Sequence, residues 1–169
     1  MSAEIVLVEI LGSHGRVQKG DLHEESVRIP LIVRWPAGLE PHVASQQVAA
    51  LVDLAPTLLD LVGAETPSHM HGQSRANVLR GGRSAPAEDY AIIETGRGIG
   101  IRTPTHLYSL PFVDDAHQLA ETPDMFFDLA ADPYQMRNLA GTGEQADVAR
   151  DLDRRLRAWD ARTPWMGER

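Results

Sequence analysis

The chain contains no cysteine among its 169 residues. A disulfide framework, a thiolate metal site and a cysteine nucleophile are therefore excluded for this chain. Basic side chains are also outnumbered, with 16 Lys and Arg against 24 Asp and Glu, and the formal net charge is −8. Nonspecific nucleic-acid binding needs a basic surface, so this charge balance disfavours a nucleic-acid partner.

Long apolar runs are missing as well. The longest run, about residues 29–33, is far too short to span a bilayer. The N-terminal residues include Glu4 and Glu9 and lack a basic segment, so they do not resemble a signal peptide. We therefore expect a soluble, cytoplasmic protein that binds neither membranes nor nucleic acid.

The first half of the chain alternates apolar runs with turns. Residues 5–11 and 29–35 are rich in β-branched and apolar side chains, which predicts two strands, and the second is expected to be covered on both faces. The stretch VDLAPTLLDLVGAETP predicts a helix that begins with Asp53 as its cap and ends before Gly63. This order of elements indicates an α/β first half.

The sequence pattern changes after a linker, SAPAED, at residues 84–89. Short strand-like runs separated by turn residues predict a small antiparallel sheet at residues 90–94, 98–102, 106–110 and 125–129. Residues 143–162 predict a helix with Val148, Leu152, Leu156 and Trp159 on its apolar face. We expect two domains, residues 1–84 and 85–169.

Three segments, in this order, resemble the C-terminal part of the sulfatase family, within the alkaline-phosphatase-like superfamily. They read GSHGRVQKGDLHEESVRIPLIVRWPAG, VDLAPTLLDLVGAETP and FFDLAADPYQMRNLAG. The resemblance runs from about Glu9 to the end of the chain. It implies the C-terminal part of a sulfatase-like α/β sandwich, followed by a small antiparallel sheet packed on a C-terminal helix.

The resemblance also implies a chemistry. In that family a formylglycine, made from Cys or Ser in a Cys/Ser-x-Pro-x-Arg motif, attacks the sulfate sulfur, and oxygen ligands hold a calcium ion. Lys19 matches the family lysine that binds sulfate, and His14 matches a position that often lines the substrate pocket. On the residues alone, Lys19 as a solvated loop lysine and His14 as a histidine bonded to backbone stay open as alternatives.

The remaining charged residues of the first segment are interpreted as structural. Glu24 and Arg28 are expected to position backbone, because a buried arginine needs a carboxylate partner, and Glu24 or Glu25 is the nearest. The pair His69 and His71 lacks an evident third ligand, so no metal site is predicted there.

The chain departs from the family at its reactive positions. The positions that align with the family's metal-binding Asp and its neighbour hold Val6 and Leu7, which offer no oxygen. The nearest Ser-x-Pro begins at Ser84 and ends in Glu88 rather than Arg. We therefore expect neither calcium nor formylglycine in this chain, and no catalysis by the chain alone.

Three functions are consistent with these patterns. The first is a sulfuric ester hydrolase by descent, inert alone, that binds a sulfate ester or another small anion. The second is a non-enzymatic assembly or anion-binding module. The third is a phosphoester hydrolase of the same superfamily with zinc and a Ser or Thr nucleophile, which needs Asp and His ligands at several places. Because apolar strands that lack neighbours pair with other chains, we also expect a homo-oligomer.

Overall fold

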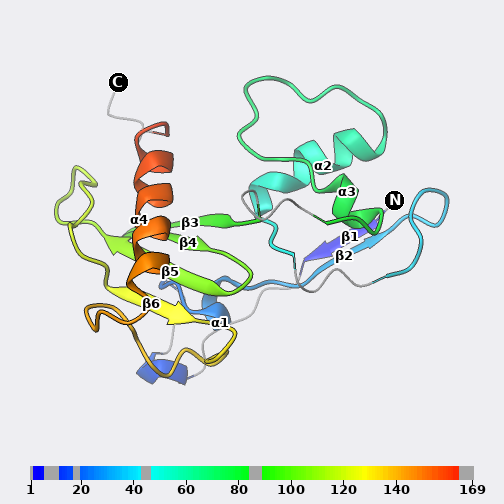
Figure 1. Cartoon of the computed structure of the whole chain (residues 1–169). Helices are drawn as coiled ribbons and strands as arrows, with labels where there is room; N and C mark the ends of the chain where they lie inside the picture. Colours follow the sequence, from blue (N-terminus) through cyan, green and yellow to red (C-terminus); the bar gives the residue numbers. More distant parts are fainter. Residues whose placement is uncertain (1, 6–11, 17–19, 43–46, 84–88, 164–169) are drawn as a thin grey trace. The chain divides into compact units, whose positions relative to one another are not determined.

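The computed structural model describes residues 2–5, 12–16, 20–42, 47–83 and 89–163 (Figure 1). The chain divides into two compact units, one formed by residues 1–7 and 29–91 and the other by residues 8–28 and 92–169. The loop that carries His14 thus belongs to the same unit as the C-terminal sheet, whereas the sequence interpretation placed it in a domain of residues 1–84. The division into two functional domains stays a prediction.

The first unit contains a two-stranded antiparallel sheet. Strand β1, Ser2–Ile5, pairs with β2, Leu31–Arg34, so that Ser2 lies opposite Arg34. Most of the strand predicted at residues 5–11 falls outside the described residues. The strand predicted at residues 29–35 is confirmed as β2, but its expected cover on both faces is wrong: Ile32 is 62% exposed. The reason is that this sheet has only β1 and β2 in the described part of the chain.

Three helical segments complete the first unit. They are η2, Leu51–Asp53, then α2, Leu54–Leu61, and α3, Ala76–Leu79. Helix α2 is confirmed, and Gly63 follows it in the left-handed conformation with φ 74°.

The sequence predicted that the side chain of Asp53 caps α2, but the structure shows no such cap. Its buried carboxylate accepts the amides of Ala50 at 3.0 Å and Gln73 at 2.8 Å, and lies 3.1 Å from Nε of the buried Arg75. The guanidinium of Arg75 also donates to the carbonyl of Tyr90 at 3.4 Å. The carboxylate therefore links η2 to the segment that leads into α3.

The second unit is built on a four-stranded sheet with the order β3-β4-β5-β6. All four strands predicted in the second half are confirmed, as β3, Ala91–Thr95, β4, Gly98–Arg102, β5, His106–Pro111, and β6, Met125–Asp128. The predicted C-terminal helix is confirmed as α4, Ala146–Asp160, which packs against β4 and β5 through its apolar face (Figure 1). Leu152 and Leu156 of that face are buried.

The two faces of this sheet have different partners. Tyr108 of β5 donates its hydroxyl to Asp153 of α4 at 3.0 Å, and burial is the main cause that raises the pKa of Tyr108. The neighbouring Leu107 packs instead in a buried cluster with Leu22 and Phe127. Because successive residues of a strand point to opposite faces, α4 and the segment around Leu22 cover opposite sides of β5.

Two glycines of β4 allow neighbouring segments to pack closely against this strand. A Cβ on Gly100 would lie 2.8 Å from Cδ1 of Leu22, and a Cβ on Gly98 would overlap the carbonyl oxygen of Leu110 in β5. Gly96, in the turn before β4, faces open space. A larger residue at Gly98 would therefore meet the backbone of β5, whereas at Gly100 it would meet the end of the Leu22 side chain and at Gly96 nothing within 4 Å.

Helix α1, Glu24–Val27, is attached to the sheet by an ion pair. Arg102 donates from Nε to Oε1 of Glu24 at 3.0 Å and from Nη2 to Oε2 at 2.9 Å. The prediction that Glu24 or Glu25 partners a buried Arg28 is wrong on both counts. Arg28 is exposed, and Glu24 is bound to an arginine 78 residues further along the chain.

Asp128 organises the turn after β6. Its Oδ2 accepts Nε2 of Gln145 at 2.8 Å, and its Oδ1 accepts the amides of Ala130 and Ala131, each at 3.0 Å. The hydrogen bond from Gln145 is the largest cause that holds the pKa of Asp128 below its ordinary value, followed by the amide of Ala131.

Candidate functional site

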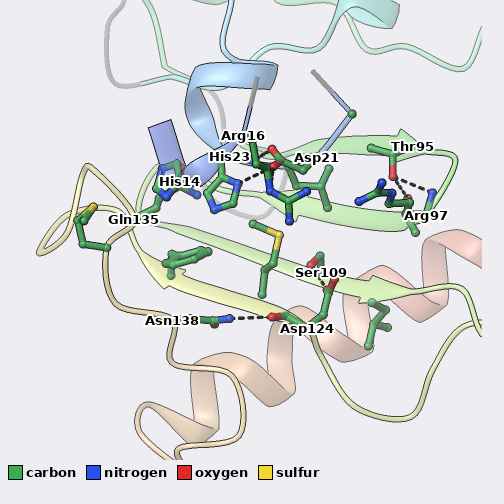
Figure 2. Close-up of a pocket in the computed structure, with 17 residues that line it drawn as sticks. His14, Arg16, Asp21, His23, Thr95, Arg97, Ser109, Asp124, Gln135 and Asn138 are labelled. Carbon is green, nitrogen blue, oxygen red and sulfur yellow. Dashed lines mark hydrogen bonds and ion pairs between the residues drawn. The ribbon is translucent and has the colours of Figure 1, made fainter. Parts of the chain in front are cut away.

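A cleft of about 420 Å³ lies within the second unit (Figure 2). Three parts of that unit form its walls: residues 14, 16 and 20–23, the hairpin between β3 and β4, and strands β5 and β6 with the segments that flank β6. The polar residues at the cleft are His14, Arg16, Asp21, His23, Thr95, Arg97, Ser109, Asp124, Gln135 and Asn138. Of the two predicted site residues, His14 lines the cleft and Lys19 lies outside the described residues.

Asp21 organises the loop side of the cleft. Its Oδ2 lies 2.8 Å from Nε of Arg16 and 3.0 Å from Nδ1 of His23, and its Oδ1 accepts the His23 amide at 3.1 Å. The contacts of Oδ2 are not aligned as hydrogen bonds, and the one with Arg16 is an ion pair. The Asp21 side chain is only 8% exposed, whereas that of Arg16 is 45% exposed. Arg16 is therefore held at its Nε while its outer nitrogens stay accessible to a ligand.

His14 is positioned by stacked rings. Its ring lies 3.9 Å from that of His23 at an interplanar angle of 19°, and the His23 ring lies 5.8 Å from that of Phe127 in β6. The backbone of His14 is left-handed, with φ 54°, which is uncommon for a residue other than glycine. His14 makes no side-chain hydrogen bond within the described residues, so its ring nitrogens are not used by the backbone there.

The opposite wall presents one cation and one anion. Arg97 is exposed in the hairpin, where the hydroxyl of Thr95 accepts its amide at 3.2 Å. Asp124 accepts the hydroxyl of Ser109 at Oδ1, and its carbonyl accepts Nδ2 of Asn138 at 2.7 Å (Figure 2). Ser109 thus holds the Asp124 carboxylate at Oδ1, and Thr95 holds the backbone of Arg97. The second carboxylate oxygen of Asp124 accepts no hydrogen bond within the described residues.

The side chains of this cleft can bind a small anionic ligand that also carries hydroxyl groups. Guanidinium groups form paired, charge-assisted hydrogen bonds with the oxygens of sulfate, phosphate or carboxylate groups. A carboxylate such as that of Asp124 accepts hydrogen bonds from hydroxyl groups. Arg16 and Arg97 offer the first kind of contact, and Asp124 offers the second.

A family model described as N-sulphoglucosamine sulphohydrolase, C-terminal, matches residues 12–162. The chain belongs to this sulfatase family. The resemblance seen in the sequence is thereby confirmed, and so is the fold class expected from it.

Individual sulfatases and their relatives are similar to the chain over most of its length. An N-acetylglucosamine-6-O-sulfatase of Bacteroides thetaiotaomicron is 33% identical over 153 residues, which are 84% of this chain and 26% of that protein. PehA, a multifunctional alkaline phosphatase superfamily protein of Trinickia caryophylli, is 30% identical over 165 residues, 89% of this chain and 32% of PehA.

Solved structures agree. A 2-O GAG sulfatase superimposes with a TM-score of 0.73 at 25% identity, covering 91% of this chain and 34% of that one. A protein in complex with its substrate D-glucosamine-2-N,6-O-disulfate gives 0.67 at 29% identity, with 90% and 32% covered. The chain thus spans about a quarter to a third of the length of these relatives.

The expectation that this chain holds neither calcium nor formylglycine stays a prediction. Among the described residues, no group of three or more His, Cys, Asp or Glu side chains could hold a metal ion. His69 and His71 are both exposed in the first unit. The chain has no cysteine, and Ser84 lies outside the described residues.

Sequence reasoning missed most residues of the cleft. Arg16, Asp21 and His23 lie in the loop that the sulfatase resemblance marked, but that resemblance drew attention only to His14 and Lys19. Arg97 and Asp124 belong to a hairpin and to a turn before β6, and no local motif connects them. These two residues reach the same cleft only because the strands next to them pair in the sheet.

No helix within the described ranges is long and apolar enough to cross a membrane.

Proposed function

We propose that this chain is the part of a sulfatase that binds the sulfated sugar, and that the cleft around Arg16 and Arg97 receives the sulfate ester. The observation that carries the proposal is that two arginines and His14 line one cleft, in the segment that the sulfatase family model matches. Relatives named for glucosamine sulfates support a sulfated amino sugar as the ligand.

Each side chain has a distinct part in this binding. Arg16 and Arg97 bind the sulfate oxygens, because guanidinium groups match the geometry of tetrahedral oxyanions. Asp21 positions Arg16 and, through His23, the ring of His14. Asp124 accepts a hydroxyl of the sugar ring.

We further propose that the purified chain does not hydrolyse sulfate esters. The family's reaction proceeds through a covalent intermediate, and a chain without the nucleophile loses many orders of magnitude in rate. No residue of this sequence stands in the Cys/Ser-x-Pro-x-Arg motif that sulfatases convert to formylglycine. The chain therefore recognises the ester, and the transfer step needs groups that these residues do not supply.

Calorimetric titration of the purified chain with N-acetylglucosamine 6-sulfate tests the binding role. Arg16→Gln and Arg97→Gln should each weaken binding about tenfold or more, because a hydrogen bond to a charged group contributes roughly 1.5–3 kcal/mol. Arg154→Gln is the matched control, because Arg154 pairs with Asp151 on the exposed surface of α4. Unchanged affinity in both cleft variants would overturn the proposal.

A turnover assay tests the inert state separately. The chain is incubated with an aryl sulfate and calcium, and in parallel with an aryl phosphate and zinc. We expect no product from either. Sulfate release would contradict the absence of catalysis, and phosphate release would favour the phosphoester hydrolase alternative.

Self-association is a second candidate role, because apolar side chains of the first unit are exposed. In strand β2, Ile32 is 62% and Leu31 38% exposed, and Leu51 in η2 is 61% exposed. Exposed apolar surface of this kind marks interaction sites. Light scattering after gel filtration should give the mass of an oligomer, and a monomer at all concentrations would contradict this role.

A further inference from the structure

His42, in the first unit, has a backbone carbonyl oxygen at each of its two ring nitrogens. Its Nδ1 lies 3.0 Å from the carbonyl oxygen of Glu40, and its Nε2 lies 3.0 Å from the carbonyl oxygen of Val78 in α3. A carbonyl oxygen only accepts hydrogen bonds, so the ring must donate in both contacts. Neutral imidazole has a single N–H group, whereas imidazolium has two. Only the protonated ring can therefore form both bonds.

His106, in the second unit, also has two partners but does not need the second proton. Its Nδ1 lies 2.9 Å from the hydroxyl oxygen of Thr105, and its Nε2 lies 2.8 Å from Oε1 of Gln145. A hydroxyl group both donates and accepts, so a neutral ring can donate from Nε2 and accept the Thr105 hydroxyl at Nδ1. The two histidines thus differ in the kind of partner that each ring meets.

The contact between His42 and Val78 joins two segments that lie 36 positions apart in the chain. Val78 lies near the C-terminal end of α3, and its carbonyl also accepts the amide of Gly81 at 3.0 Å. The contact with Glu40 is local, because it spans only two positions. His42 therefore attaches the segment that follows β2 to the turn that ends α3.

Charged side chains lie close in sequence to these two carbonyls, namely Glu40, Arg75, Arg80 and Arg83. Arg75 pairs with the buried Asp53 at 3.1 Å. Arg80 pairs with Asp60 of α2 at 3.4 Å. Glu40 and Arg83 are exposed. The two arginines that flank α3 thus have carboxylate partners of their own.

The backbone oxygens also favour the charged form of the ring. The carbonyl of Glu40 is the largest cause that raises the pKa of His42, the carbonyl of Val78 is the second, and burial opposes both. A raised folded-state pKa adds stability that is fully present below the ordinary value of 6.5. This stability is lost as the pH rises through the folded-state pKa.

We propose that His42 is a proton-dependent link that fastens the segment after β2 to the C-terminal end of α3. When the ring loses one proton, one of its nitrogens becomes an acceptor that faces a carbonyl oxygen, and that contact opens. The first unit is therefore held together more firmly in acid than in weakly alkaline solution. This inference does not rest on the proposed function, because the anion-binding cleft belongs to the second unit.

Nitrogen-15 NMR of the imidazole groups measures the protonation of His42 directly. Spectra of the whole labelled chain are recorded between about pH 5 and about pH 9, the range in which histidine changes its charge. We expect the midpoint of His42 to lie above 6.5, the ordinary value for histidine. A midpoint at or below 6.5 would overturn the inference.

Native-state hydrogen exchange tests the mechanical consequence. The amides of Arg80 and Gly81 report on the end of α3, because they donate to the carbonyls of Ala76 and Val78 at 2.9 Å and 3.0 Å. Their protection, relative to that of the β5 amides, should fall about threefold to tenfold between about pH 5.5 and about pH 8. This factor corresponds to the loss of one intramolecular hydrogen bond.

His42→Gln should abolish this pH dependence, because the glutamine side chain is neutral throughout the range. His42 is exposed, so the variant should still fold. His69→Gln is the matched control and should keep the pH dependence, since His69 is exposed in the same unit and makes no side-chain hydrogen bond within the described ranges. An equal fall in the unchanged chain and in His42→Gln, or no fall in the unchanged chain, would contradict the proposed link.

Discussion

Replacing Asp53 by alanine should destabilise the first unit by about 3–5 kcal/mol, the usual result of removing one partner of a buried ion pair. The Asp53 side chain is 7% exposed and that of Arg75 8% exposed. The substitution leaves this guanidinium without its carboxylate, and it leaves the amides of Ala50 and Gln73 without their acceptor. Because Arg75 keeps its bond to the carbonyl of Tyr90, we expect a value near 3 kcal/mol.

Asp53→Asn separates the charge from the shape. The amide keeps one oxygen in place and can still accept a backbone N–H, but it cannot neutralise Arg75. The loss should then be smaller, about 1.5–3 kcal/mol, the range for a hydrogen bond to a charged group. Arg80→Ala is the control, because Arg80 pairs with Asp60 at 3.4 Å through side chains that are 47% and 41% exposed. It should have a much smaller effect.

Native-state hydrogen exchange measures these changes unit by unit. Amides of α2 report on the first unit, and amides of β5 report on the second. Asp53→Ala should speed exchange in α2 by about a hundredfold, since each 1.4 kcal/mol corresponds to a factor of ten. If Asp53→Ala changes α2 exchange no more than Arg80→Ala does, the reasoning about the buried pair is refuted.

Three further changes test the second unit. Gly98→Ala should lower the unfolding free energy by about 1–3 kcal/mol in urea titrations, whereas Gly96→Ala should not; equal midpoints would contradict the overlap derived for Gly98. Asp128→Asn should be destabilising at pH 7, because a lowered carboxyl pKa adds stability above the ordinary value of 3.8. This stability is lost as the pH falls through the folded-state pKa, so a difference that persists in full at pH 2 would contradict the assignment. Arg102→Lys should cost about 1 kcal/mol in thermal unfolding, because lysine cannot form both bonds to Glu24; an unchanged midpoint would count against the paired geometry.

Much of the fold could be predicted because it is encoded in short-range patterns. The alternation of apolar residues with turns predicted all four strands of the second unit, and helical spacing predicted α2 and α4. Cover on β2 could not be predicted, because an apolar run looks the same whether or not other strands lie beside it. The exposed Ile32 is the result.

Long-range polar contacts are what sequence reasoning could not supply. Asp53 was expected to cap its own helix, but its carboxylate binds residues up to 22 positions away. Glu24 or Glu25 was expected to pair with Arg28, whereas Glu24 binds Arg102. Closeness in the sequence did not identify the partner of either carboxylate, because strand pairing and helix packing determine which charged side chains meet.

Only part of the candidate site could be predicted from the sequence. The glycine-containing loop was marked from the sequence, and it carries His14, Arg16 and Asp21 at the cleft. Arg97 and Asp124 lie in the turn between β3 and β4 and in the turn before β6, so only the fold brings them to the cleft. The role of His14 in substrate contact stays a prediction, and so does that of Lys19, which lies outside the described residues.

The most direct test of the central claim is an amide NMR titration of the ¹⁵N-labelled chain with N-acetylglucosamine 6-sulfate and, in parallel, with N-acetylglucosamine. Recognition of the sulfate by Arg16 and Arg97 predicts saturable shifts at residues 12–16, 20–23 and 95–98 with the sulfated sugar only. Equal shifts with both sugars, or shifts confined to α4 or to the first unit, would contradict it.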